Sequence, residues 1–447
     1  MVKRLMAALI AIAAALCWTA PAYAHGRSGA ADARFAQTIA GMELTVVVRA
    51  SLQVPSPLQV DVVVHEPGPG GRVGLTLRSV ETGAVSSGEA LVERGRRGMY
   101  PVVLSADRVG PHELVVRAGD ERSVLPFDLL VAGAPPWEVG VYVAFACAAV
   151  ALIGALVAAA LSRRLVAGGF GVVFVTATAV ALTVAGVSPF FTPPVPDGAR
   201  PVSEQERLLG KPNAQPLIEV EPERPAAYGE FLLRVTLFDG STGRPADDLA
   251  EHHAALAHMV VTSRDGAYFR HVHPVRVAPG VYEVRLRAGG PGRHLVYAEF
   301  ERLDAGGQLV SGAFTIAPGK ERRESPPAAG DGGKAVVLRP ARPVAGQPVT
   351  IELDTGAGAV QPWLGMAGHL ILRSEDGGFL GHVHENASMT AVTERVPDES
   401  VARFGGRLSF TFSFPRPGRY LAWIQYCKDY AIVTVPRVIE VAAEGST

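Results

Sequence analysis

Two histidine triads with the same internal spacing occur in the second half of the chain, and imidazole is a common ligand of transition metals. The triads are His258, His271 and His273, and His369, His382 and His384. The segments that contain them, residues 257–274 and 368–385, align without a gap. Neutral imidazole nitrogens suit copper and zinc. The repeat therefore points to transition-metal binding at two places in one chain.

A hairpin geometry would bring each triad together on one face of a sheet. Asp265 and Gly266 lie between two apolar runs, and Asp-Gly in that position is a strong signal of a short β-hairpin turn. If these two residues form the turn, His258 lies opposite His273, and His271 has its side chain on the same face. Directly opposed Cβ atoms are about 4.5–5.5 Å apart, so the three imidazoles converge. The same count from the turn places His369, His382 and His384 together on one face of the second hairpin.

Three imidazoles leave a fourth coordination position for water, a substrate or a thioether. Met366, just before the second triad, could supply sulfur, and soft thioethers favour Cu(I). Met259 follows His258, but a regular strand would point it to the opposite face. His252 and His253 lie in the preceding loop and could reach the first site. We therefore expect copper, or zinc, to be bound by the six histidines and Met366.

The start of the chain and its apolar segments predict export and membrane insertion. Residues 1–24 have the basic start, short apolar core and small-residue cleavage motif of a signal peptide. Residues 139–161 and 165–187 are charge-free and long enough for transmembrane helices. Arg163 and Arg164 assign the turn between them to the cytoplasm. We expect a two-pass protein of the bacterial cytoplasmic membrane, with both mature termini on the periplasmic or extracellular side.

The rest of the chain has the pattern of antiparallel β-sandwiches, because short β-branched and apolar runs alternate with Gly and Pro clusters. The predicted fold class is mainly β, with three immunoglobulin-like antiparallel β-sandwich domains and a two-helix transmembrane hairpin. The predicted ranges are 25–135 for an N-terminal sandwich, 188–215 for a linker, 216–317 for the first histidine module, 318–333 for a second linker and 334–445 for the second module.

Composition excludes some classes of protein. The net charge is −1, so no global field attracts nucleic acid, and none is expected as a partner. Charged residues make up 19% and hydrophobic residues 48%, a balance typical of a chain with membrane segments. Beyond the signal peptide only Cys147 and Cys427 occur, so no disulfide framework is expected despite export. The expected partners are the membrane, a metal ion and possibly another membrane protein.

At both triads the chain resembles a family of exported bacterial modules with a Gly-His, Asp, aromatic and His-Val-His-Pro pattern, and the second module fits this pattern better. The matching residues are Trp363-Leu364-Gly365-Met366-Ala367-Gly368-His369, Trp423-Ile424-Gln425-Tyr426 and the His-Val-His motif. These modules are close to the YtkA-like β-sandwich domains found beside heavy-metal resistance genes. The first module lacks the Trp-Leu-Gly-Met segment, and the second has Glu385 where the family has Pro. The resemblance implies exported β-sandwiches and no defined activity.

Several functions remain open. The first is a membrane-anchored extracytoplasmic protein that sequesters or delivers metal. The second is a non-catalytic structural or interaction protein that docks a membrane partner complex, its histidines only bracing the hairpins. A blue-copper site is disfavoured because Cys427 has no His or Met shortly after it. An enzyme would need His25, the residue exposed by cleavage, as a copper ligand with His65 and His112. No hydrolase triad, phosphate loop or carboxylate pair stands out, so we expect no enzyme.

Overall fold

The computed structural model describes residues 32–49, 51, 53–131, 136–191, 197–198, 213–303, 305–319, 335–356, 358–391 and 398–445. The predicted signal peptide, His25 and most of both predicted linkers lie outside these residues. The described residues fall into two compact units. One includes Leu130–Ala199 and is helical, and the other contains Ala31–Leu129 and Arg200–Thr447 and is built of strands.

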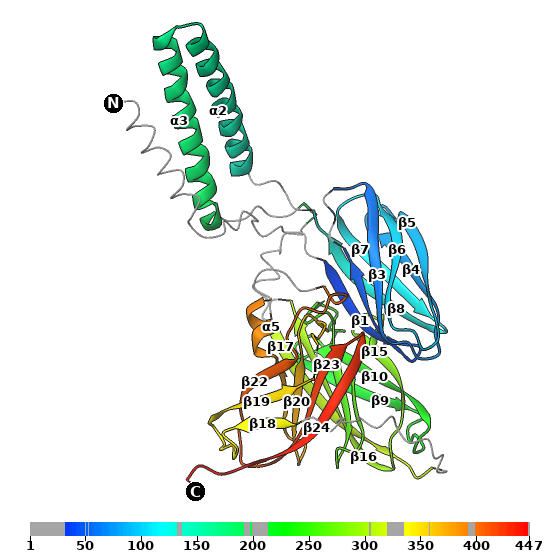
Figure 1. Cartoon of the computed structure of the whole chain (residues 1–447). Coiled ribbons are helices and arrows are strands. Elements are labelled where there is room, and N and C mark those ends of the chain that lie inside the picture. The colour runs from blue at the N-terminus through cyan, green and yellow to red at the C-terminus, as the bar shows by residue number, and fades with distance from the viewer. Residues whose placement is uncertain are drawn as a thin grey trace. The chain divides into compact units, whose positions relative to one another are not determined.

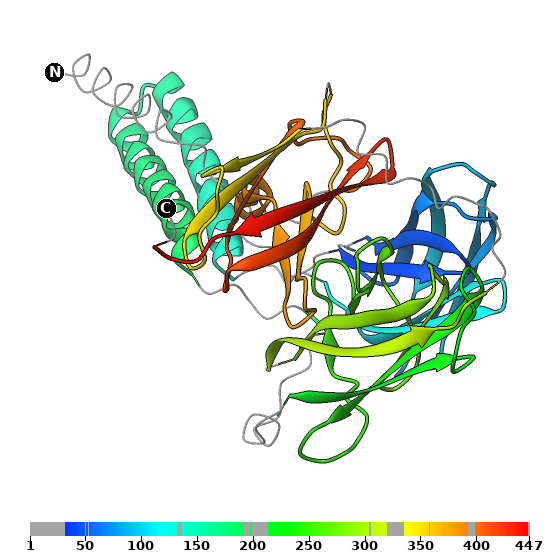
Figure 2. The same ribbon diagram turned by 90° about the horizontal axis from the view of Figure 1, so that it is seen from below.

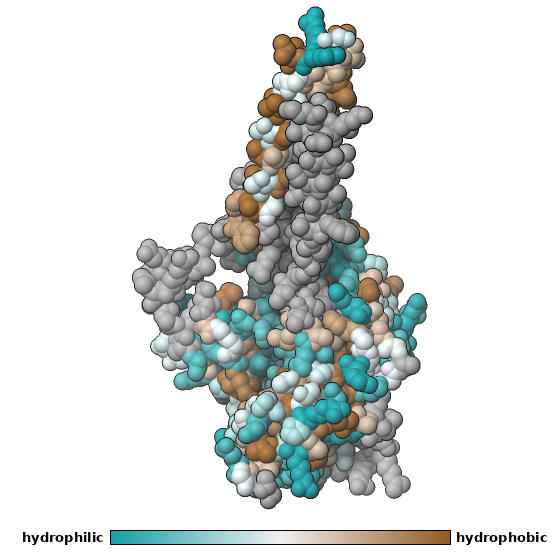
Figure 3. Space-filling model, turned by 60° about the vertical axis from the view of Figure 1, so that its left-hand side comes forward, coloured by the Kyte–Doolittle hydropathy of each residue, from teal (hydrophilic) through white to brown (hydrophobic). Residues whose placement is uncertain are grey.

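The helical unit is a hairpin of α2 (Pro136–Ala160) and α3 (Arg164–Val187), followed by the short helix η1 (Ser188–Phe190). Both long helices are apolar and long enough to cross a membrane. They pack against each other (Figure 1), and at Gly154 a Cβ atom would lie 2.9 Å from the ring of Phe170. The absent side chain therefore permits their close approach. Figure 3 shows hydrophobic residues along the visible side of the hairpin and hydrophilic residues at its tip.

The N-terminal domain is a sandwich of two four-stranded sheets with the orders β1-β2-β3-β6 and β5-β4-β7-β8. Its strands are β1 (Ala33–Ile39), β2 (Met42–Val48), β3 (Ser56–Glu66), β4 (Gly71–Ser79), β5 (Val85–Val92), β6 (Gly98–Ala106), β7 (Gly110–Ala118) and β8 (Glu121–Leu129). Alternate residues of β3, including Val60, Val62 and Val64, are fully buried between the sheets. The β-branched pattern of the sequence thus fills this core.

The first histidine module is a second sandwich, with the sheets β14-β15-β10-β9 and β11-β16-β12-β13, the latter extended by β17 beside β16. Its strands are β9 (Ala214–Glu221), β10 (Glu230–Asp239), β11 (Leu249–Ala250), β12 (His258–Ser263), β13 (Phe269–Val272), β14 (Val275–Ala278), β15 (Val281–Arg287), β16 (Gly292–Arg302) and β17 (Gly306–Ile316). Met259 lies in its core, on the side of β12 away from the histidines, as expected.

The second module repeats this arrangement, with the sheets β18-β19-β22 and β21-β20-β23-β24 (Figure 2, yellow to red). Its elements are β18 (Val336–Arg339), β19 (Pro348–Asp354), β20 (His369–Ser374), β21 (Leu380–His384), α5 (Asn386–Ala391), β22 (Arg407–Ser413), β23 (Gly418–Lys428) and β24 (Ala431–Val441). Glu385, at the family's Pro position, accepts a hydrogen bond from Ser388 N at 2.9 Å and so caps α5. The predicted fold class of three antiparallel sandwiches and a helical hairpin is confirmed.

Both histidine hairpins have the predicted register. Val260 pairs with His271 in the first, and His369 pairs with His384 in the second. The turn glycines adopt positive φ, +77° at Gly266 and +78° at Gly377. In each turn the preceding aspartate accepts hydrogen bonds from a serine hydroxyl and from a backbone N–H. The Asp-Gly pairs therefore set the register that aligns the histidines.

The two modules dock through the faces of their histidine sheets. The shared cluster consists of Val260, Tyr297, Ile371, Leu380, Leu421 and Trp423, with Phe269 and Leu295 against it. Phe269 of one module stacks on Trp423 of the other, with ring centroids 4.4 Å apart and planes 12° apart. Arg373 crosses the interface and donates to the carbonyl oxygens of Ser263 and Arg264 at 2.9 and 2.6 Å. Equivalent positions of the repeat meet, which gives the interface an approximate two-fold character.

The N-terminal domain contacts the histidine modules through β1, β2, β3 and β8. Ala36 N donates to Ala254 O at 2.5 Å, and Thr38 N donates to His273 O at 2.6 Å. Within this β-rich unit, the N-terminal sandwich therefore reaches the backbone of a candidate ligand.

Candidate metal centre

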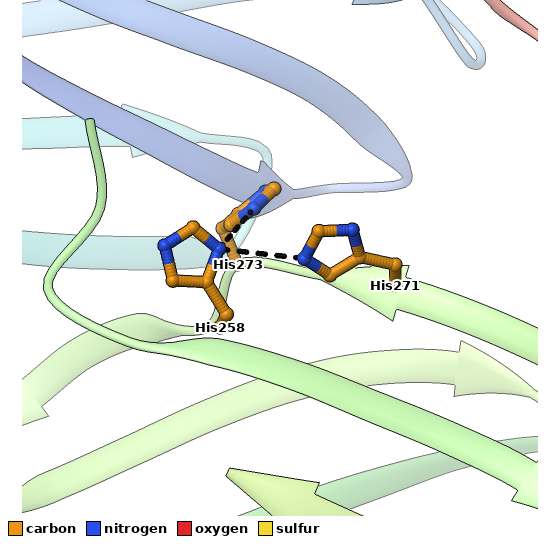
Figure 4. Close-up of side chains that lie close together, drawn as sticks. All are labelled: His258, His271 and His273. Carbon is orange, nitrogen blue, oxygen red and sulfur yellow. Dashed lines mark hydrogen bonds between the residues drawn. The ribbon is translucent and has the colours of Figure 1, made fainter. Parts of the chain in front are cut away.

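The first triad brings three ring nitrogens together at the end of one hairpin (Figure 4). His258 begins β12, His271 lies in β13, and His273 follows β13 directly. His258 Nδ1 is 3.3 Å from His271 Nε2 and 3.2 Å from His273 Nε2. All three side chains are buried. The structure thus brings together the three residues that the hairpin count predicts.

In each imidazole of the first triad, one ring nitrogen faces the other histidines. The second, outer nitrogen faces an oxygen. The three pairs are His258 Nε2 with His252 O at 3.1 Å, His271 Nδ1 with Gln425 Oε1 at 2.9 Å, and His273 Nδ1 with Glu43 Oε1 at 2.5 Å. A neutral imidazole carries one N–H, and each of these oxygens can accept it. With Glu43 ionised, each ring carries its hydrogen on the nitrogen that faces the oxygen and a lone pair on the nitrogen that faces the other histidines.

Three inward lone pairs cannot hydrogen-bond to one another and repel at these distances unless a cation lies between them. Four ligands at about 2.0–2.1 Å in tetrahedral geometry are about 3.3–3.4 Å apart. The separations of 3.2 and 3.3 Å at His258 match this spacing. Hydrogen bonds from the outer ring nitrogens to carboxylate, carbonyl and amide oxygens are also typical of metal-bound histidines. The residues present therefore fit a copper or zinc ion.

The second triad repeats the geometry in part. His369 Nδ1 is 3.0 Å from His382 Nε2, His369 Nε2 faces Trp363 O at 3.0 Å, and His382 Nδ1 faces Glu299 Oε2 at 2.8 Å. The His384 ring lies 5.2 and 4.9 Å, centroid to centroid, from those of His369 and His382. Its Nε2 is buried and has no hydrogen-bond partner within the described part of the chain. The Nε2 atoms of His112 and His294 are also buried without such a partner, but only His384 lies in a group of three histidines.

The middle histidine of each triad is oriented by the other module. His271 is held by Gln425 on β23, and His382 is held by Glu299 on β16. Glu299 pairs with His258, and Gln425 pairs with His369, so both residues occupy the same position of the repeat. The two modules therefore exchange supporting groups across their interface. The sequence analysis missed both residues, although counting the strand that pairs with each first histidine would have found them.

The six imidazoles form one continuous cluster. His382 lies 5.5 Å from His258 and 5.4 Å from His271, measured between ring centroids, and His271 lies 6.2 Å from His369. Distances within the triads range from 4.9 to 5.5 Å. The triads are thus neighbours at the module interface, where the sequence left their relation open.

Burial keeps these imidazoles neutral. Loss of hydration lowers the pKa of His271 and of His273 to about 3 and that of His384 to about 4, and the neighbouring imidazoles act in the same direction. Burial also raises the pKa of Glu43 to about 8 and that of Glu299 to about 7. A cation held by the histidines would favour the ionised carboxylates and oppose those two shifts. Neutral imidazoles are the form that binds metal.

Acidification is expected to destabilise the metal-free protein. The folded-state pKa values of these histidines lie below the ordinary value of 6.5, so below pH 6.5 the unfolded chain binds more protons. The raised pKa values of Glu43, Glu251 and Glu299 act in the opposite direction, but the six histidines of the triads outnumber these carboxylates, so the free energy of unfolding falls as pH falls from 7 to 5. Thermal unfolding of the detergent-solubilised chain, followed by circular dichroism, should show a lower midpoint at pH 5. Equal midpoints at the two pH values would contradict neutral burial of the cluster.

Other predicted residues have different places. Met366 is buried in a tight turn with Trp363, and no contact of its sulfur with a histidine is among the described interactions, so a thioether ligand stays a prediction. His65 Nε2 contacts Glu399 Oε2 at 3.3 Å. His112 Nδ1 faces Gly110 O at 2.9 Å. The described contacts do not join these two histidines, and His25 lies outside the described residues.

Comparisons with known proteins are limited. Residues 328–443, which include the second triad, match a family described as a domain of unknown function, DUF8832. No curated protein matches the chain.

The solved structures that align with the chain include adhesion proteins. A tetra-tandem repeat from the extending region of a large adhesion protein aligns over 89% of this chain and 73% of its own, at 10% identity and a TM-score of 0.17. The adhesin InvE of Yersinia pseudotuberculosis aligns over 51% and 60%, at 13% identity and a TM-score of 0.19. Invasin, a bacterial integrin-binding protein, aligns over 89% and 58%, at 10% identity and a TM-score of 0.15. Likenesses at these TM-scores carry no argument about what this chain does.

Proposed function

We propose that the protein is a membrane-anchored extracytoplasmic metal binder that holds one ion in each histidine triad, with copper favoured over zinc, for sequestration or delivery. The observation that carries the proposal is the convergence of three inward lone pairs at His258, His271 and His273, whose outer nitrogens each face an oxygen acceptor. All-imidazole sites suit both metals, and copper binds more tightly to a given nitrogen site.

The proposed location rests on the helical hairpin and the start of the chain. Both long helices expose apolar side chains, among them Val150, Ile153, Leu156 and Val172. In lipid such side chains are in a favourable environment, whereas in water they would form a large apolar surface. A cleaved signal peptide and the two arginines between the spans would place both mature termini outside the cytoplasm of a bacterial cell. The resemblance to YtkA-like modules fits this placement.

A non-catalytic interaction protein is the second candidate. In that case the histidines would only brace the interface between the modules, where His271 and His382 already cross to Gln425 and Glu299. Metal content separates the two candidates.

Metal titration of the full chain in detergent is expected to reach about two equivalents of Cu(II) or Zn(II). A variant with His271→Ala, His273→Ala, His382→Ala and His384→Ala should lose nearly all of this binding, because each triad retains one ligand. The control is His112→Ala with His294→Ala, which removes two buried histidines outside the cluster. Binding should be measured by calorimetry and by metal analysis after gel filtration.

A folded wild-type protein that binds no more metal than the four-histidine variant would overturn the metal proposal and favour the interaction protein. The full chain is required for this test, because Glu43 of the N-terminal domain holds His273.

A further inference from the structure

The two triads are equivalent in the repeat but are covered by different residues. A tight turn precedes each first histidine, and both turns close with a pair of backbone hydrogen bonds. These join His252 to Ala255 at 2.9 and 3.1 Å, and Trp363 to Met366 at 2.8 and 3.0 Å. The second residue of each turn has positive φ, 48° at His253 and 53° at Leu364. His252 and His253 thus occupy the places of Trp363 and Leu364.

Each turn reaches the triad of the other module. The indole of Trp363, in the second module, lies 5.6 Å from the ring of His271 and 5.9 Å from that of His273, and it is fully buried. The ring of His253, in the first module, lies 3.9 Å from that of His384. The indole of Trp363 therefore lies against both triads, since it is also 5.2 Å from the ring of His369, whereas the described ring contacts of His253 reach only the second triad.

His252 and His253 lie in a row beside the second triad, in which His382 and His384 are only partly buried, whereas all three histidines of the first triad are buried. The side chain of His252 is 33% exposed and its Nε2 lies 3.7 Å from Glu301 Oε2. Its ring is 3.9 Å from that of His253, which in turn contacts His384. Nε2 of His384 is the buried nitrogen without a described hydrogen-bond partner. The first triad has no such row among the described residues, since Trp363, Gln425 and Glu43 lie around it.

We propose that His252 and His253 form a loading site for copper or zinc ions, through which metal exchanges with the second triad, while the first triad retains its ion. The inference rests on the proposed metal-binding function and deepens it. Sites with a free or exchangeable ligand position exchange metal, and fully enclosed sites hold it. His253 offers an added ligand next to His384, so an ion can be passed between imidazoles without being released to water.

The test uses His253→Leu, which installs the residue that the second module carries at the equivalent turn position with nearly the same φ. The full chain in detergent is loaded with two equivalents of Zn(II) and challenged with excess chelator, and metal release is followed with time. The wild type should release zinc in two phases of equal amplitude. His253→Leu should slow the fast phase by about tenfold and leave the slow phase unchanged.

Two double variants assign the phases. His382→Ala with His384→Ala should remove the fast phase, and His271→Ala with His273→Ala should remove the slow one. His294→Ala, outside the cluster, is the control and should release zinc like the wild type. Two bound equivalents with one release phase, or a fast phase that His253→Leu leaves unchanged, would overturn the loading site and leave metal binding intact. A wild type that binds no zinc would overturn both.

Discussion

Replacing Trp423 by alanine is expected to lower the free energy of unfolding by about 3–5 kcal/mol, the usual cost of truncating a buried large aromatic residue. Trp423 is 3% exposed and stacks on Phe269 across the interface between the modules. The loss would leave a cavity between the two histidine hairpins. Chemical denaturation of the full chain, followed by circular dichroism, measures the change in the free energy of unfolding.

The matched control is Val103→Ala in the N-terminal sandwich. Val103 is 66% exposed, so its truncation should change stability by about 0.5 kcal/mol or less. A Trp423→Ala variant as stable as this control would mean that the two modules do not depend on the interface. Because the same interface joins the triads, we also expect Trp423→Ala to weaken metal binding at both.

Glu299→Leu is expected to weaken metal binding at the second triad by about 10–100-fold, the usual effect of removing a group that orients a ligand. Glu299 belongs to the first module and accepts the Nδ1 hydrogen of His382 at 2.8 Å. Without this acceptor the hydrogen of the His382 ring is no longer held on Nδ1. The lone pair of Nε2 is then no longer directed toward the other histidines of the triad. Glu299→Gln should retain most of the affinity, because the amide of Gln425 performs the same role for His271.

The affinity should be measured by chelator competition in a background of His271→Ala and His273→Ala, so that only the second triad binds. Affinities of Glu299→Leu and Glu299→Gln that both equal the affinity of the parent would show that orientation by Glu299 is unimportant. A loss in Glu299→Gln as large as that in Glu299→Leu would show that the negative charge matters rather than the acceptor.

Local patterns in the sequence were enough to predict the hairpins and the fold class. Asp265 and Gly266 fixed the register, because this pair is suited to the positive φ of the turn. The period of two then placed His258 and His271 on one face. The sandwiches and the two apolar helices follow from equally local signals, alternation in the strands and uninterrupted hydrophobicity in the helices.

The contacts between domains could not be predicted, because no local periodicity encodes them. Glu43 and His273 are 230 residues apart, and Gln425 and His271 are 154 apart. These pairs depend on how whole sandwiches dock. For the same reason the sequence left open whether the triads meet. Met366 was chosen for its proximity along the chain, which does not determine where a side chain points.

The exchange of Glu299 and Gln425 between the modules has an implication for the history of the chain. Two equal surfaces that each complete the other form the isologous contact of a homodimer. The duplicated half of this protein has the form of such a dimer joined into one polypeptide. Fusion of two such copies would leave them free to diverge, as at the turn that has His252 and His253 in one module and Trp363 and Leu364 in the other. An ancestor with a single module would have gained the group that orients its middle histidine only by pairing with a copy of itself.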